Sequence, residues 1–414
     1  GGDIAPVEPV VETPAPAASG WEFSGTAKVY YQTHDFGGDL FEQETSAADF
    51  GLQLRATNAD VVAGIGAGVE VSGLSTLNLE NWMVSNVMQS VGNVYGIYDI
   101  DEATDGGWIS QMYLTYGFGN TSIKAGRQEL PKALSPFAFS EDWNVWKNTF
   151  DAVLIVNTDI QDTTLVGAYV GGANYNGFGV LGGLSGYPLN ITNFDNINSN
   201  SGAYMLTVQN KSIENLTLTG SWYYLPDDAY PEDINILWGD AQYDAGMFNV
   251  AIQGGAVMSD MFNDDTTAFG AKVGGSVSGI NLMAAYATTS NDDHGGFAIQ
   301  QLGGQTSALY TETVVDQIGQ KWGGYTRSNM DKFVVGANAD VLGGNLGAVY
   351  SYNEFTPWGY TTHKVDEFDV VYSANVTDSI NVTAAYVYAN DDSNTGNDNF
   401  DSNNIVRVIG TYNF

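Results

Sequence analysis

The 414-residue chain contains no cysteine, which excludes a disulfide scaffold and any metal or redox site built on thiolates. Basic residues are scarce as well: 13 lysines and arginines stand against 48 aspartates and glutamates, for a formal net charge of −35. A chain with so few basic residues and no basic patch is poorly suited to bind nucleic acid. No apolar run approaches the ~18 residues that a membrane-spanning helix needs, so a helical membrane protein is excluded too.

Histidine is also rare, and its positions argue against an enzyme. The three histidines are His34, His294 and His363, and each lies in or beside an expected loop. No serine nucleophile elbow and no pairing of an acid with a histidine stands out in the sequence. We therefore predict that the protein is not an enzyme.

What the chain does have is a regular alternation of apolar and polar residues. Eighteen short segments between residues 21 and 414 show it. In one of them, for example, Leu52 and Leu54 alternate with Gln53 and Arg55. A period of two places the two sets on opposite faces of a β-strand. The alternation alone fits a soluble sandwich as well as a membrane barrel.

The gaps between the segments distinguish the two folds, because short and long gaps alternate strictly. Antiparallel strands with turns at one end and loops at the other are typical of a transmembrane β-barrel. We therefore predict an all-β fold, a single eighteen-stranded antiparallel transmembrane barrel over residues 21–414. Its apolar face would contact lipid, its polar face would line a wet lumen, and both termini would lie on the turn side. The short gaps fall at 58–60, 119–120, 160–162, 212–214, 245–246, 278–279, 343 and 377–378, and the long gaps at 35–46, 73–108, 129–148, 175–202, 226–233, 259–266, 290–330, 355–363 and 391–401.

Residues 1–20 differ from the rest of the chain. They contain four prolines among alanine, valine and glutamate, and proline favours extended polyproline geometry. We expect a mobile, Pro-rich periplasmic tail. No charged-then-apolar start is present, so we interpret the chain as mature, with its signal peptide already removed.

Acidic residues gather in the long gaps, for example at 227–233 and 391–401. They would either solvate exposed loops or concentrate cations at a pore mouth. Asp99, Asp101 and Asp105 loosely resemble a calcium loop without its full spacing, and hard oxygen ligands suit Ca²⁺. Ca²⁺ is therefore a possible ligand of this segment.

Six basic residues share the polar side of their strands. Any charged side chain in a barrel strand must avoid lipid, and this alone would place the six residues in the lumen. The functional alternative is a column of cations that faces acidic residues across the pore. These predicted wall residues are Lys28, Arg55, Lys124, Lys272, Lys332 and Arg407.

The third long gap, 129–148, differs from the acidic loops because it combines balanced charge, two prolines and four aromatic residues. Such aromatic content is awkward in a loop surrounded by water. We predict that it folds back into the barrel and constricts the channel; the alternative is an external cap packed on neighbouring loops. The aromatic residues are Phe137, Phe139, Trp143 and Trp146, and the candidate constriction residues are Arg127, Glu129, Lys132, Glu141, Asp142 and Lys147. We expect Glu129, Glu141 and Asp142 to face basic wall residues among Lys28, Arg55, Lys124 and Arg127.

The segment around this gap carries a family resemblance. Residues 123–129, the Pro-rich loop and residues 149–155 resemble the constriction region of OprD-type porins, especially the major outer-membrane porins of campylobacterial bacteria. Residues 406–414 end in Phe414, and this terminal aromatic resembles the signal read by the barrel-assembly machinery. The resemblance implies an eighteen-stranded barrel, usually trimeric, whose third extracellular loop narrows the pore.

The same resemblance implies the function. Small hydrophilic solutes would diffuse with a preference for cations, sometimes with Ca²⁺ near the constriction, where Glu129, Glu141 and Asp142 are the candidate ligands. OprD-type members also carry a basic ladder for substrate carboxylates; Lys28, Arg55, Lys124 and Arg127 are the candidates here, and they make a sparser ladder.

We therefore predict a bacterial outer-membrane porin for passive diffusion of small hydrophilic solutes and ions, moderately cation-selective. No cofactor is required. The expected partners are the lipid bilayer, lipopolysaccharide, the assembly machinery and two further copies in a homotrimer. The alternative is an adhesin or structural barrel with long surface loops. A twenty-residue tail is too short for the plug of a gated transporter.

Overall fold

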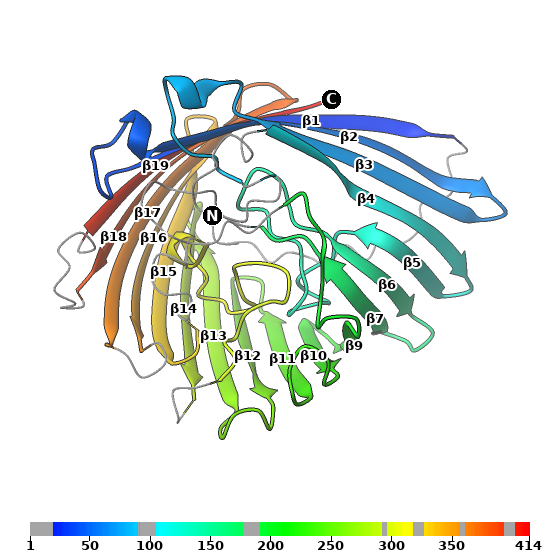
Figure 1. Cartoon of the computed structure of the whole chain (residues 1–414). Helices are drawn as coiled ribbons and strands as arrows, with labels where there is room; N and C mark the ends of the chain where they lie inside the picture. The colour runs from blue at the N-terminus through cyan, green and yellow to red at the C-terminus, as the bar shows by residue number, and fades with distance from the viewer. Residues whose placement is uncertain are drawn as a thin grey trace.

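Eighteen long antiparallel strands form one closed ring in the computed structural model (Figure 1). The structure describes residues 20–89, 91, 105–176, 191–291, 296–317, 327–356, 361–392 and 402–414. Strand β1 (Glu22–His34) pairs with β2 (Ser46–Val62) on one side and with β19 (Ser402–Asn413) on the other, which closes the ring. The predicted all-β barrel is confirmed.

Each remaining strand pairs with its neighbours in chain order. The two-residue β8 (Asp195–Asn196) pairs only with the end of β7, so β7 and β9 are the neighbours in the ring. The strands are β3 (Ile65–Ser75), β4 (Asp105–Phe118), β5 (Thr121–Gln128), β6 (Phe150–Asn157), β7 (Thr163–Ala173), β9 (Ala203–Ile213), β10 (Leu216–Leu225), β11 (Ile234–Asp244), β12 (Phe248–Met258), β13 (Thr266–Val277), β14 (Ile280–Ser290), β15 (Met330–Val341), β16 (Gly344–Phe355), β17 (His363–Asn375) and β18 (Ile380–Asp391). The helical turns are η1 (Gln43–Thr45), η2 (Leu79–Asn81) and α1 (Val314–Gln317).

None of the helices that the structure describes is long and apolar enough to cross a membrane.

Seven of the eight predicted short gaps fall at or within about two residues of the observed turns, and one is wrong. The chain does not turn at Asn58–Asp60; β2 continues to Val62 and the turn is formed by Ala63 and Gly64, which have φ angles of 53° and 81°. A tight turn needs residues with positive φ, whereas Asn58 only accepts a hydrogen bond from the Asp60 amide at a shift in register. The prediction of this turn was wrong because it relied on polar residues alone.

The apolar alternate residues form the outer face of the barrel. In β2, Leu52 and Leu54 are 48% and 50% exposed, whereas Gln53 between them is 9% exposed and points inward. In β4, Ile109, Met112 and Leu114 are likewise exposed. A closed barrel with an apolar outside leaves no unpaired strand edge, which is the requirement for spanning a bilayer.

The start of β1 and the C-terminal residue meet on the turn side of the ring. Phe414 exchanges backbone hydrogen bonds with Gly25 of 2.8 and 3.0 Å, and its ring stacks on Tyr412. Of the predicted tail, only Gly20 belongs to the described residues, so the prediction of a mobile periplasmic tail stays a prediction.

The lumen is partly filled by loops, which Figure 1 shows inside the ring as teal-to-green and yellow segments. The third loop, 129–149, lies between opposite walls. Phe137 packs on Trp238 of β11, with 5.4 Å between the ring centroids. At the other end, Trp146 packs with Tyr30 of β1 and lies over Gly51 of β2, where any side chain would clash with its indole ring. The predicted inward fold of this loop is confirmed.

Candidate pore constriction

Hydrogen bonds attach the third loop to the barrel wall on two sides of the lumen. The Tyr223 hydroxyl of β10 accepts a bond from the Phe137 amide at 3.2 Å and bonds the Ser135 hydroxyl at 2.9 Å. On the other side, the Tyr30 hydroxyl donates to the Trp143 carbonyl oxygen at 3.1 Å. The Trp146 indole N–H donates to the Gly73 carbonyl oxygen of β3 at 3.1 Å. These bonds hold the third loop in a fixed position across the lumen. We call this loop, residues 129–149, the crossbar.

Four charged side chains gather where the crossbar meets β1, and we call them the eyelet: Lys28, Glu129, Asp142 and Lys147. Lys147 forms an ion pair with Glu129, with 3.1 Å between Nζ and Oε2. Asp142 is exposed to the lumen, and it acts electrostatically on both Lys28 and Lys147. Burial alone would lower the pKa of Lys147, but Glu129 and Asp142 raise it above its ordinary value, so this ammonium stays charged.

The other basic residues near the eyelet have partners in the wall. Arg55 pairs with Glu70, its direct cross-strand neighbour on β3, at 2.6 Å. Arg127 forms two bonds to Asp151 on β6, of 2.8 and 3.1 Å. Lys124 lies 3.9 Å from the centroid of the Tyr113 ring.

These pairings agree with the expected arrangement of opposed charges at one residue and depart from it at two. Asp142 acts on Lys28, as expected, whereas Arg55 and Arg127 pair with wall carboxylates. A cross-strand neighbour sits within about 5 Å and is nearer than any group across a lumen. Arg55 and Arg127 therefore pair with their neighbours in the wall rather than with the carboxylates of the third loop.

Glu141 also departs from the expected position. Glu141 is 4% exposed, and its side chain lies between the third loop and the seventh long connection. Its carboxylate binds neutral donors: the Trp143 indole N–H at 2.8 Å, the Gln301 amide at 2.7 Å, and the Thr306 hydroxyl and backbone N–H, both at 2.6 Å.

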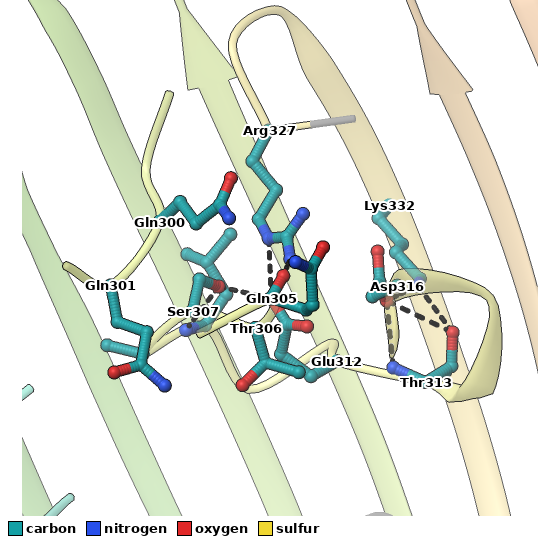
Figure 2. A network of polar contacts seen from close by, with 12 residues as sticks. Gln300, Gln301, Gln305, Thr306, Ser307, Glu312, Thr313, Asp316, Arg327 and Lys332 are labelled. Atoms are coloured by element: carbon teal, nitrogen blue, oxygen red, sulfur yellow. Dashed lines mark hydrogen bonds and ion pairs between the residues drawn. The ribbon is translucent and has the colours of Figure 1, made fainter. Parts of the chain in front are cut away.

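The seventh connection, 291–329, is the part of the site that sequence reasoning missed. Its described residues lie inside the barrel and carry a buried polar network, shown in Figure 2. Arg327 pairs with Glu312 at 2.9 Å, and Lys332 of β15 pairs with Asp316 at 2.5 Å. A signal comparable to that of the third loop was available: the segment is a long gap with aromatic residues such as Phe297 and Tyr310 and with charges of both signs.

The remaining predicted residues lie beside the seventh loop: Lys132, Lys272 and Arg407. Lys132 lies 5.0 Å from the Phe139 ring centroid and acts on Glu312. Lys272 lies 5.2 Å from the ring centroid of Tyr310 in the seventh loop. Arg407 of β19 donates to Gln32 at 2.6 Å and to Gln317, at the end of α1, at 3.1 Å.

The calcium hypotheses gain no support from the geometry. Within the described residues, no group of three or more histidine, aspartate or glutamate side chains is placed to hold a metal ion. The trio Glu129, Glu141 and Asp142 is separated, because Glu141 binds the seventh loop. Asp99 and Asp101 lie outside the described residues, and Asp105 is the first residue of β4.

Neither a protein-family model nor a curated protein matches the chain. Solved structures do match it over nearly their whole length. OccK8 (OprE) from Pseudomonas aeruginosa is 16% identical with a TM-score of 0.69, covering 95% of this chain and 98% of that chain. OpdK from the same organism, in a structure with vanillate, is 12% identical with a TM-score of 0.70 and coverage of 95% and 98%.

A third match, OccK2 (OpdF) in complex with glucuronate, is 13% identical with a TM-score of 0.67, again covering 95% of this chain and 98% of that chain. At these identities the likeness establishes the architecture, and it agrees with the resemblance noted around residues 123–155. The chain therefore has the eighteen-stranded barrel fold of the Occ/OprD-type outer-membrane channels.

Proposed function

We propose that the protein is an outer-membrane channel through which small hydrophilic solutes and ions diffuse passively, with a moderate preference for cations. The observation that carries the proposal is the closed barrel itself, apolar outside and polar inside, whose lumen is narrowed by a loop that presents the eyelet charges. A structural barrel has no need of a loop that carries half-exposed charges through its interior. No catalytic step is part of this function.

Two features of the charge distribution favour cations. The chain carries a net charge of −35, and low-dielectric walls focus the field of such a surplus into the pore. In addition, the basic residues Arg55, Arg127 and Lys332 pair with wall or loop carboxylates, so they offer a passing anion little net positive charge. The solved neighbours that hold vanillate and glucuronate bind carboxylates; the paired cations here make a carboxylate-specific channel the weaker alternative.

The membrane setting and the assembly belong to the same proposal. A barrel with an apolar belt requires a bilayer, and the protein would sit in the outer membrane with the turns and Phe414 on the periplasmic side. Lipopolysaccharide would surround the loop end. Recognition of Phe414 by the assembly machinery and association into a homotrimer complete the proposal.

Single-channel recording in a planar bilayer tests the channel function. Stepwise current increases that are linear in voltage support a porin. Insertion without any current would instead favour the adhesin or structural barrel. Folding is checked first by the shift in gel migration between unheated and heated samples, so that silence is not mistaken for misfolding.

A further inference from the structure

Glu141 links the two inward loops because its carboxylate accepts four hydrogen bonds from them. One carboxylate oxygen, Oε1, accepts three bonds from the seventh loop, two from Thr306 and one from Gln301. The other oxygen, Oε2, accepts the indole N–H of Trp143 in the third loop. Hydrogen bonds to a charged group are about twice as strong as neutral ones. A single side chain thus joins segments about 160 residues apart in the sequence.

Backbone contacts extend the same junction. The Leu302 amide donates to the Phe137 carbonyl oxygen at 2.8 Å, and the Phe139 amide donates to the Gln301 side-chain oxygen at 3.0 Å. The Asn148 side chain donates to the Gly303 carbonyl oxygen at 2.7 Å. The two loops therefore meet along several residues, with Glu141 at the centre.

The far side of the seventh loop is anchored to the wall. Lys332 of β15 donates to Asp316 and Thr313 (Figure 2). Glu367 of β17 accepts a hydrogen bond from the Val315 amide at 3.0 Å. On β12, the side chain of Gln253 accepts the Tyr310 amide at 2.7 Å. The seventh loop therefore extends from Glu141 to the wall formed by β12, β15 and β17.

We propose that Glu141 is a positioning residue that locks the third and seventh loops into one partition across the lumen, so that both loops together set the width of the channel. This role rests on the proposed channel function and changes the assignment of Glu141 within it. Its charge is not offered to passing ions, because the side chain is buried and both oxygens bind donors. The exposed Asp142 next to it is the carboxylate that meets the solute.

Channel recordings of five variants separate these roles. Glu141→Ala and Gln301→Ala each remove one half of the junction and should give a larger, noisier conductance with little change in reversal potential. The double variant should resemble each single one, because residues in one network are non-additive. Glu141→Gln, which keeps one acceptor oxygen, should fall between wild type and Glu141→Ala. Asp142→Asn, the matched control one residue away, should shift the reversal potential and leave conductance unchanged.

A thiol measurement reports the junction without relying on current. The chain has no cysteine, so a Ser307→Cys substitution gives a single reporter at a buried site of the seventh loop. Labelling by a polar maleimide should be slow in this background and about tenfold faster when Glu141→Ala is added, the effect expected from losing bonds to a charged group. A cysteine at the exposed Ser379 should label at the same rate in both backgrounds.

The outcomes distinguish the two proposals. A wild-type protein that folds but passes no current overturns the channel function, whereas the labelling test still reports on the junction. If wild type conducts, and Glu141→Ala and Gln301→Ala leave both conductance noise and Ser307→Cys labelling at wild-type values, Glu141 does not lock the loops. A Glu141→Ala change that moves only the reversal potential, as Asp142→Asn does, also overturns the positioning role.

Discussion

At the scale of single residues, the space left by a missing side chain determines how closely the two loops approach. Gly304 has no positive φ, so it is not required for backbone conformation. A Cβ atom at this position would lie 2.4 Å from both Glu141 Oε1 and the Gln301 amide nitrogen. A Cβ atom at the neighbouring Gly303 would lie 2.6 Å from the Phe150 ring. These two glycines let the seventh loop reach the Glu141 carboxylate.

Replacement of Gly304 by alanine is therefore expected to break the junction at a cost of about 1–3 kcal/mol, the usual cost of overpacking. The variant should reproduce the larger and noisier conductance of Glu141→Ala, as measured in single-channel recordings. Gly220→Ala is the matched control, since a Cβ there meets nothing within 4 Å and φ is ordinary. A Gly304→Ala protein with wild-type conductance and noise would show that the approach is not tight.

The buried pair of Asp316 and Lys332 gives a second prediction at this scale. Removing one partner leaves a buried charge uncompensated, which costs about 3–5 kcal/mol, whereas removing both costs less. Lys332→Met should thus lower the midpoint of thermal unfolding, and addition of Asp316→Asn should restore part of the loss. If the double variant is less stable than either single one, the two side chains do not form a coupled pair.

The same pair predicts a loss of loop order in acid. Burial by itself would raise the pKa of Asp316, but Lys332 and Arg327 hold it below its ordinary value. The ionised form is therefore favoured in the fold, and its stabilising effect is present at neutral pH and disappears as the pH falls below about 4. Burial raises the pKa of Glu312, so that residue contributes with the opposite sign.

The labelling rate of the Ser307→Cys reporter as a function of pH measures how the titration of Asp316 and Glu312 together changes the order of the seventh loop. The rate relative to the Ser379→Cys control should rise as the pH falls through the acidic range. In an Asp316→Asn background the rise should be smaller, because the group that loses its charge is gone. Identical pH profiles in the two backgrounds would exclude Asp316 as the titrating residue.

At the scale of strands and loops, the sequence was informative wherever a local pattern is imposed by physics. A period of two predicts which face Lys28 occupies, because a charge cannot face lipid. The aromatic content of the third loop predicted that this loop lies inside the barrel. The turn after β2 was misplaced because Asn58 and Asp60 are polar, whereas the conformation depends on Ala63 and Gly64. Long-range partners such as Glu141 and Gln301 have no local signature, so the junction between the loops could not be predicted.

Deletion of residues 133–142 tests the two loops as elements. The deletion removes Phe137 and Glu141, and with them the support of the seventh loop. Conductance should rise by more than in Glu141→Ala, and selectivity should weaken because Asp142 is lost as well. Single-channel conductance and reversal potential are compared after folding has been checked by gel migration. Unchanged values for both quantities would mean that the third loop does not narrow the pore.

At the scale of the whole molecule, the chain carries an acidic surplus, and three of its wall cations, Arg55, Arg127 and Lys332, are paired with carboxylates. The proposed cation preference rests on this surplus of 48 acidic over 13 basic residues, whose field the low-dielectric walls would focus into the pore. Mobile ions screen this potential over ~10 Å at 0.1 M salt and ~3 Å at 1 M. Selectivity for cations should thus be clearest in dilute salt and should weaken as the concentration rises.

The most direct test is the reversal potential of the wild-type channel across a planar bilayer with a KCl gradient. Dilute solutions should give a potential of the sign set by K⁺, and repetition of the gradient around 1 M should bring the potential closer to zero. Asp142→Asn should reduce the dilute-salt value in the same direction. A wild-type potential of the sign set by Cl⁻ in dilute salt would contradict the proposed cation preference.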